Sequence, residues 1–443
     1  MDPITLALLA IGLLLLLILI GFPIGYALAG ATIVMMLFVG DASEVMYIAE
    51  GAFTSMDSIE LVALPMFIFM GAIISISPAG SDIYAALSRL LPIPGGLGIS
   101  TICGCAMFSA ISGSAPATVA AIGSSGVPAM LARGYPPRLA TGLVVGGGTL
   151  GILIPPSIVL LFYGVVTKTS IGQLFLAGIL PGLMFVVLFS LYTWARMRRH
   201  LASLTPAERA ELVALETSFG TAGSGWAELR RVLPFFTLIA GIMIALYGGW
   251  ATPSEIAAIG ALASIVLVVV IYRITDAATW QTLLMKSVRD TSMILIIAAF
   301  AYGFAQFLSY HGVVSELTSL LLDAFPNKWV TLLLLWVLML VLGCFLPPFA
   351  IIVIVAPMFL PFILDTGMNP IWFGIFATIN MEMGCITPPL GINLFVTKSI
   401  ARQVPMSDIT AGSMPFFAIL ALGSLLITIF PQIVLFLPET MMR

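Results

Sequence analysis

The sequence predicts an all-α protein that crosses a membrane several times and consists of two related halves. Hydrophobic residues make up 60% of the 443 positions and charged residues only 8%, whereas soluble domains are about half apolar and a quarter charged. Apolar runs of the roughly 20 residues that a bilayer span requires recur along the chain, beginning with residues 4 to 40. The net charge of −3 is small and scattered, so it indicates no nucleic-acid partner.

Glycine and proline carry the evidence for duplication. Gly134–Pro137 matches Gly367–Pro370, and Gly151–Pro156 matches Gly384–Pro389, each at a distance of 233 positions. Membrane segments interrupted by Gly and Pro at corresponding places in two halves mark the binding region of many secondary transporters. The pattern therefore favours transport across the lipid bilayer.

Basic residues predict the orientation of the chain. The longest polar stretch, Arg196 to Arg231, holds six arginines, and the positive-inside rule places it in the cytoplasm. When the membrane crossings are counted in both directions from this stretch, 14 of the 17 basic residues fall on the cytoplasmic side. Lys168, Lys328 and Arg443 fall on the outer side. Pro137 and Pro370 then lie on opposite sides, which makes the halves inverted repeats. The N-terminus has no basic leader region, so its first apolar run is expected to be a retained helix.

Several segments are expected not to span the bilayer. Residues 94–131 and 328–364 are predicted re-entrant helical hairpins, with tips at Ser112–Pro116 and Phe345–Pro348. Such irregular backbone survives at membrane depth only where protein or a wet cavity shelters it. Residues 42–58, 80–92, 275–290 and 312–324 are shorter and amphipathic, which is typical of interfacial helices.

These elements divide the chain into six parts. The first repeat consists of a scaffold with arm helices (1–93) and a transport domain with an inward hairpin and a broken helix (94–185), and a cytoplasmic connector follows (186–231). The second repeat consists of a scaffold with arm helices (232–327) and a transport domain with an outward hairpin and a broken helix (328–418). The last helix end and the C-terminus complete the chain (419–443).

Each half thus supplies a hairpin tip and a helix interrupted near Pro-Pro. Broken helices expose carbonyl groups at one end and amide N–H groups at the other. Carbonyls and hydroxyls suit a hard cation such as sodium, and two or more sodium ions are predicted. The first site would use Ser112, Ser114, Thr149 and Gly151, and the second would use Phe345, Pro347, Gly384 and Thr387. One such break is most simply a packing kink, but four in two symmetric pairs favour binding sites.

Substrate contacts are expected in the same region, at Ser112, Ser114, Ser157, Glu382 and Asn393. Glu382 is an acidic residue in an apolar span, which by default indicates a functional role. Its carboxyl group could balance the charge of a cation, accept a proton or pair with a backbone donor. Ser157 starts a half-helix whose hydroxyl and amides could meet a carboxylate. Asn393 and Asn380 flank the second break, where capping of a half-helix is the alternative role.

At these residues the chain resembles the large, DctM-like membrane subunit of tripartite ATP-independent periplasmic (TRAP) transporters. The matching motifs are Ile111–Ala115, Arg133–Tyr135, Gly151–Ser157, Ser170–Gly182 and Ile386–Phe395. The resemblance covers essentially the whole chain. It departs from the family pattern at the outer hairpin tip, where Pro347-Pro348 replaces Asp-Pro. The second site would then use carbonyls alone, or Glu382 would substitute for the missing acid.

The resemblance implies an elevator-type, sodium-driven secondary transporter of the ion-transporter superfamily, located in the bacterial inner membrane. It further implies a small four-helix membrane subunit, called Q, and a soluble periplasmic binding protein, called P, that delivers a small organic anion. A stand-alone sodium/dicarboxylate symporter of similar architecture is the first alternative. An intramembrane enzyme is disfavoured, because His200 and His311 are far in sequence from a Gly-flanked serine.

Overall fold

The computed structural model describes residues 2–39, 44–91, 93, 95–210, 212, 214, 226–324 and 327–441. Within these ranges the regular structure is helical throughout. Seven described helices are long and apolar enough to cross a membrane, or eight if the bent pair Ile59–Ser75 and Ala79–Leu90 counts as one span. The predicted all-α, multi-pass membrane protein is confirmed. Arg443 and most of the polar stretch from 211 to 225 lie outside the described residues.

The first half begins at a capped helix start, where the Asp2 carboxylate accepts from the Thr5 amide at 3.3 Å. Further along, Pro137 stands at the first position of its helix, where its missing N–H costs nothing. The elements of this half are α1 (Pro3–Leu19), α2 (Ile24–Val39), α3 (Glu44–Met56), the short 3-10 helix η1 (Ile59–Val62), α4 (Ala63–Ser75), α5 (Ala79–Leu90), α6 (Gly96–Ser112), α7 (Ala115–Leu131), α8 (Pro137–Gly148), α9 (Leu150–Leu153), α10 (Ile158–Thr167) and α11 (Ile171–Ser203).

The second half repeats this order. Its elements are α13 (Trp226–Tyr247), α14 (Pro253–Tyr272), α15 (Ala277–Tyr310), α16 (Val313–Ala324), α17 (Lys328–Gly343), α18 (Pro348–Asp365), α19 (Pro370–Cys385), α20 (Ile392–Ile400), α21 (Met406–Ile429) and α22 (Gln432–Met441). Helices α8 and α19 both begin at a proline, 233 positions apart, and α7 and α18 begin at the same spacing. The Pro155-Pro156 and Pro388-Pro389 bonds of the two interruptions are both cis. The duplication seen in the sequence is therefore a duplication of structure.

Three of the four short amphipathic helices form as separate elements, namely α3, α5 and α16. The fourth expectation, for residues 275–290, is wrong, because residues 277–290 are the first part of α15, which continues unbroken for 34 residues. Asp276 caps its start by accepting from the Thr279 amide at 2.9 Å, and no proline follows within the helix. The corresponding stretch of the first half is interrupted near Ser58, whose hydroxyl donates to the Glu60 carboxylate beside η1.

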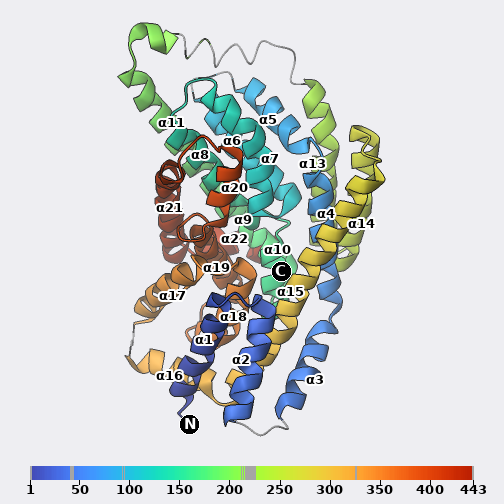
Figure 1. Cartoon of the computed structure of the whole chain (residues 1–443), viewed down its shortest axis with the longest axis vertical. Helices are drawn as coiled ribbons and strands as arrows, with labels where there is room; N and C mark the ends of the chain where they lie inside the picture. Colours follow the sequence, from blue (N-terminus) through green and yellow to red (C-terminus); the bar gives the residue numbers. More distant parts are fainter. Residues whose placement is uncertain are drawn as a thin grey trace.

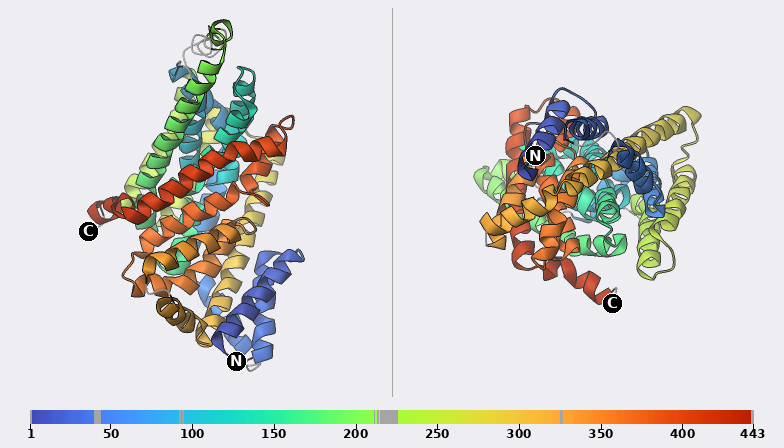
Figure 2. Two further views of the ribbon diagram at one scale, coloured as in Figure 1. Left: turned by 90° about the vertical axis from the view of Figure 1, so that its left-hand side faces the viewer. Right: turned by 90° about the horizontal axis from the view of Figure 1, so that it is seen from below.

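Two helical hairpins lie toward opposite ends of the molecule. The pair α6–α7 turns at Gly113 and Ser114, and the pair α17–α18 turns over residues 344–347. In Figure 1 the first hairpin lies toward the end where α11 finishes and α13 begins, and the second lies toward the end where α1 begins. The further views in Figure 2 show the two chain termini well apart on the surface. Opposite placement of the hairpins is what an inverted repeat requires.

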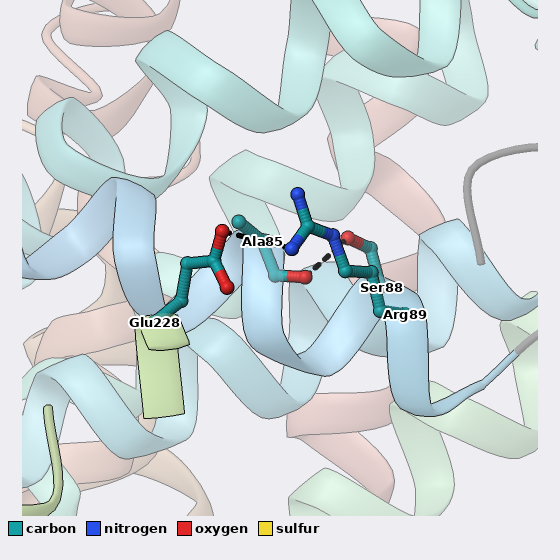
Figure 3. Close-up of polar contacts among 4 residues, drawn as sticks. All are labelled: Ala85, Ser88, Arg89 and Glu228. Atoms are coloured by element: carbon teal, nitrogen blue, oxygen red, sulfur yellow. Dashed lines mark hydrogen bonds and ion pairs between the residues drawn. The ribbon is translucent and has the colours of Figure 1, made fainter. Parts of the chain in front are cut away.

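Polar contacts join α5 to the helices beside it. The Arg89 guanidinium pairs with the Glu228 carboxylate of α13 at 2.8 Å (Figure 3). The Tyr272 hydroxyl of α14 donates to the Asp82 carboxylate at 3.0 Å. Both contacts link the segment that leads into the first hairpin to the α13–α14 pair of the second half.

Close helix packing holds α8 against α21. Gly142 faces the Gly412 carbonyl so closely that an added Cβ would overlap it. The same helix pair is joined by the ion pair between Arg138 and Asp408 at 2.7 Å. Small residues at helix crossings allow this approach in membrane proteins, where packing replaces the hydrophobic effect as the driving force.

Replacing Gly142 by alanine should therefore destabilise the protein by about 1–3 kcal/mol, the usual cost of overpacking a tight contact. Thermal unfolding in detergent measures this effect. Gly241 on α13 is the matched control, since nothing lies within 4 Å of a Cβ added there. Equal melting temperatures for the Gly142→Ala and Gly241→Ala variants would contradict the close α8–α21 packing.

Candidate functional site

The first hairpin tip packs directly against the interrupted helix of the same half. Gly113 ends α6 with a φ of 61°, a left-handed conformation that favours glycine. A Cβ added there would lie 2.7 Å from the Pro156 carbonyl oxygen. A Cβ added to Gly151 would lie 2.7 Å from the Ser114 carbonyl carbon. The structure thus brings together the residues that the sequence pairs as the first site.

Hydroxyl groups cluster at this tip. Ser112 is only 3% exposed, and its Oγ lies 3.2 Å from the Thr118 Oγ1. Thr118 donates to the Ser114 carbonyl at 2.9 Å and lies 3.3 Å from the Ser109 hydroxyl. Sequence reasoning missed Thr118. Its position one helical turn after Ser114, at the start of α7, was the available signal.

The second hairpin tip meets its own interrupted helix in the same way. A Cβ added to Gly384 would lie 2.5 Å from the Gly343 carbonyl oxygen. The Leu390 amide, in the segment between α19 and α20, donates to the Cys344 carbonyl at 3.3 Å. Phe345 is 47% exposed, so its backbone rather than its side chain is the part available to a site. The two stretches thus touch through Gly343 with Gly384 and Cys344 with Leu390. Whether Phe345, Pro347 and Thr387 form a site with them stays a prediction.

Each interrupted helix contains a threonine whose hydroxyl proton is donated to a backbone carbonyl of the same helix. Thr149 donates to the Gly146 carbonyl at 2.6 Å, and Thr387 donates to the Met383 carbonyl at 2.6 Å. Each hydroxyl therefore keeps oxygen lone pairs for another ligand. Oxygen lone pairs are what a hard cation requires, so these two threonines fit the sodium sites that the sequence predicts.

Ser157 and Glu382 are both buried. Ser157 is the N-cap of α10, where its Oγ accepts from the Leu160 amide at 3.2 Å; the expected helix-start position is correct. Its hydroxyl proton remains available to an acceptor. Glu382 is 2% exposed, and neither carboxyl oxygen has a hydrogen-bond partner among the described residues. An unpaired acid at this depth is costly, which indicates a role other than folding.

Asn393 reaches from the second half toward the first. It is fully buried, and neither of its amide atoms is hydrogen-bonded within the described chain. A Cβ added to Gly148 would lie 3.4 Å from its Nδ2. The capping alternative is wrong for both asparagines, because Gly391 is the N-cap of α20 and Asn380 donates to the Phe376 carbonyl within α19.

One cavity of about 930 Å³ reaches both hairpin tips. Its lining includes Ser112–Pro116 from the first tip and Pro347–Phe349 from the second, facing α4 and the first turns of α15. Lys286 contributes a positive charge to its wall, and Asp276 and Asp290 contribute negative charges. Of the predicted site residues, Ser112, Ser114 and Pro347 line this cavity, and the others do not belong to its lining. A larger cavity of about 1250 Å³, lined by η1, the α10–α11 connection and the end of α15, contains neither tip.

Residues 11–433 match the tripartite ATP-independent periplasmic transporter family, DctM component. The chain belongs to this family. It is therefore a membrane component of a TRAP transporter, not an enzyme.

Individual relatives agree with this assignment. The C4-dicarboxylate TRAP transporter large permease protein DctM of Pseudomonas aeruginosa is 34% identical over 415 residues, which cover 93% of each chain. The isethionate TRAP transporter permease protein DctMQ of Oleidesulfovibrio alaskensis is 31% identical over 94% of this chain and 64% of that protein. The crystal structure of the Alcanivorax borkumensis YdaH transporter, at 16% identity, matches 88% of this chain and 89% of its own with a TM-score of 0.64. That likeness establishes a shared fold.

The unpaired state of Glu382 has a measurable consequence. Replacing it with methionine, of similar size, should leave the melting temperature in sodium-free detergent unchanged or raise it, because a buried polar group without a partner does not stabilise the fold. The same variant should lose uptake if the carboxyl group is functional. A melting temperature several degrees below that of the wild type would show that the carboxyl group has a stabilising partner.

Proposed function

We propose that this chain is the transport subunit of a sodium-coupled uptake system, which carries a small organic anion across the bacterial inner membrane by an elevator mechanism. The observation that carries this proposal is the single cavity onto which both hairpin tips open, with each tip held against an interrupted helix. Two tips facing one space allow ions and a substrate to be bound in the same place.

Sodium is the coupling ion that best fits the donors. The groups near the tips are hydroxyl and carbonyl oxygens, including those of Thr149 and Thr387, whose own protons are donated elsewhere. Thiolate and imidazole ligands, which transition metals prefer, do not form any cluster of three or more metal-binding side chains in the described ranges. Two sites, one in each half, would give at least two sodium ions per cycle.

The helix N-termini at the two tips favour an anionic substrate. Helices α7 and α18 begin at the tips, where the first N–H groups of a helix have no intrahelical partner. Pro116 and Pro348 carry no N–H, so groups such as those of Ala115 and Phe349 are the ones available. Such ends favour negative charge. The relatives named for C4-dicarboxylate and isethionate support a carboxylate or sulfonate cargo, and the binding protein would select between such cargoes.

The two cavities support alternating access. The cavity that contains the tips adjoins the first turns of α15, and the larger cavity adjoins its last turns. Movement of the hairpins past α4 and α15 would carry the tips from one cavity to the other. Sodium and substrate would then each raise the affinity for the other by the same factor, because equilibrium coupling is reciprocal.

A small membrane subunit and a periplasmic binding protein would complete the system. The relative named DctMQ is longer than the region that matches this chain, which supports a further membrane component. Reconstitution into liposomes tests the partners directly. Uptake that requires all three proteins supports the proposal, and sodium-driven uptake by this chain alone would favour the stand-alone symporter instead.

Removal of single hydroxyls should weaken sodium binding. Ser114→Ala and Thr387→Ala should each raise the sodium concentration for half-maximal uptake by roughly 5–30-fold, which corresponds to about 1–2 kcal/mol. Thr428→Ala is the control, since that hydroxyl donates only to the Ser424 carbonyl of its own helix. Unchanged sodium dependence in both site variants would remove these residues from the sodium sites.

The orientation can be tested by cysteine labelling in a variant without the four native cysteines. A cysteine at Tyr310, whose side chain is 77% exposed at the end of α15, should react with a membrane-impermeant reagent in intact spheroplasts. A cysteine at Ala202, exposed near the end of α11, should react only after permeabilisation. The opposite pattern would invert the proposed topology.

A further inference from the structure

We propose that Thr118 is a positioning residue that fixes the hydroxyl protons of the first hairpin tip, so that Ser112 presents oxygen lone pairs to a cation. This inference rests on the proposed sodium-coupled function. It also distinguishes between the two roles open to Ser112, which are ligand to a cation and hydrogen-bond donor to the substrate anion.

The Thr118 hydroxyl group has a single proton. Thr118 Oγ1 donates that proton to the Ser114 carbonyl at 2.9 Å. The same oxygen can then only accept hydrogen bonds from the hydroxyl groups of Ser112, 3.2 Å away, and Ser109, 3.3 Å away. Ser112 therefore donates its proton to Thr118. Its remaining lone pairs face away from Thr118, and Ser112 has no proton left for an anion.

The Ser114 carbonyl is taken up by the same arrangement. It accepts from the Thr118 amide at 3.0 Å and from the Thr118 hydroxyl at 2.9 Å. Because a carbonyl oxygen has two lone pairs, this group is saturated. Ser114, which lines the cavity, is thus left with its hydroxyl as the group that can reach a ligand. Hydrogen bonds of this kind orient the groups that bind an ion, although the residue that makes them does not contact the ion itself.

The second tip lacks this device. The position 233 residues after Thr118 is Ile351, an apolar side chain that is 1% exposed. That tip is instead held by the Leu390 amide on the Cys344 carbonyl. Loss of the Thr118 hydroxyl should therefore affect the first site and leave the second intact.

The test uses a replacement of nearly equal shape. In the reconstituted system, Thr118→Val should raise the sodium concentration for half-maximal uptake by about 5-fold or more. The substrate KM at saturating sodium should stay unchanged, because the substrate does not use this hydroxyl. Thr118→Ser keeps the hydroxyl and should restore sodium dependence to within about 2-fold of wild type.

Thr141→Val is the matched control, because that buried hydroxyl donates only to the Pro137 carbonyl one turn back in α8. Adding Thr118→Val to Ser112→Ala should raise the sodium requirement no further, since both changes remove the same ligand. Thr118→Ala serves if the valine variant does not fold.

Unchanged sodium dependence in Thr118→Val, or an equal change in Thr141→Val, would overturn the positioning role. A raised substrate KM with unaltered sodium dependence would assign Ser112 to the anion instead. Sodium-independent uptake by the wild-type system would contradict the proposed function itself, which separates the two failures.

Discussion

The structure depends on one constraint, which is that backbone leaving a helix inside a membrane must be sheltered and hydrogen-bonded by the protein. Each half contains two such places, a hairpin tip and an interrupted helix, and each tip is placed against the interruption of its own half. Gly151 lies against the Ser114 backbone, and Gly384 lies against Gly343. Glycine at these contacts lets two irregular segments protect each other, and the polar groups that remain face a shared cavity.

The two halves have the same backbone plan but different chemistry. Thr149 of the first half corresponds in position to Glu382 of the second, and Thr118 corresponds to Ile351. The first tip is ordered by hydroxyl hydrogen bonds, whereas the second is tied by a backbone bond from Leu390. Symmetry therefore explains how the two tip regions arise and why the two hairpins lie toward opposite ends of the molecule. The substitutions between the halves are where differences in ion and substrate preference would originate.

Much of this architecture is encoded locally and could be predicted. The hairpins and interruptions follow from Gly and Pro at matching positions, and Ser157 follows from helix-capping chemistry. The continuity of α15 was missed because an amphipathic stretch does not reveal whether the next apolar turn extends it. The surroundings of Asn393 could not be predicted, for a different reason. Its neighbour Gly148 belongs to the other half, and no periodicity in a single sequence records a contact between such distant residues.

The central claim is that the two symmetric tip regions bind sodium together with an organic anion. The most direct measurement is the sodium-to-substrate coupling ratio, obtained from the sodium gradient that just balances an opposing substrate gradient in liposomes containing the complete system. Two sites predict that at least two sodium ions move with each substrate molecule. A substrate gradient that does not change when the sodium gradient is changed would contradict sodium-coupled transport.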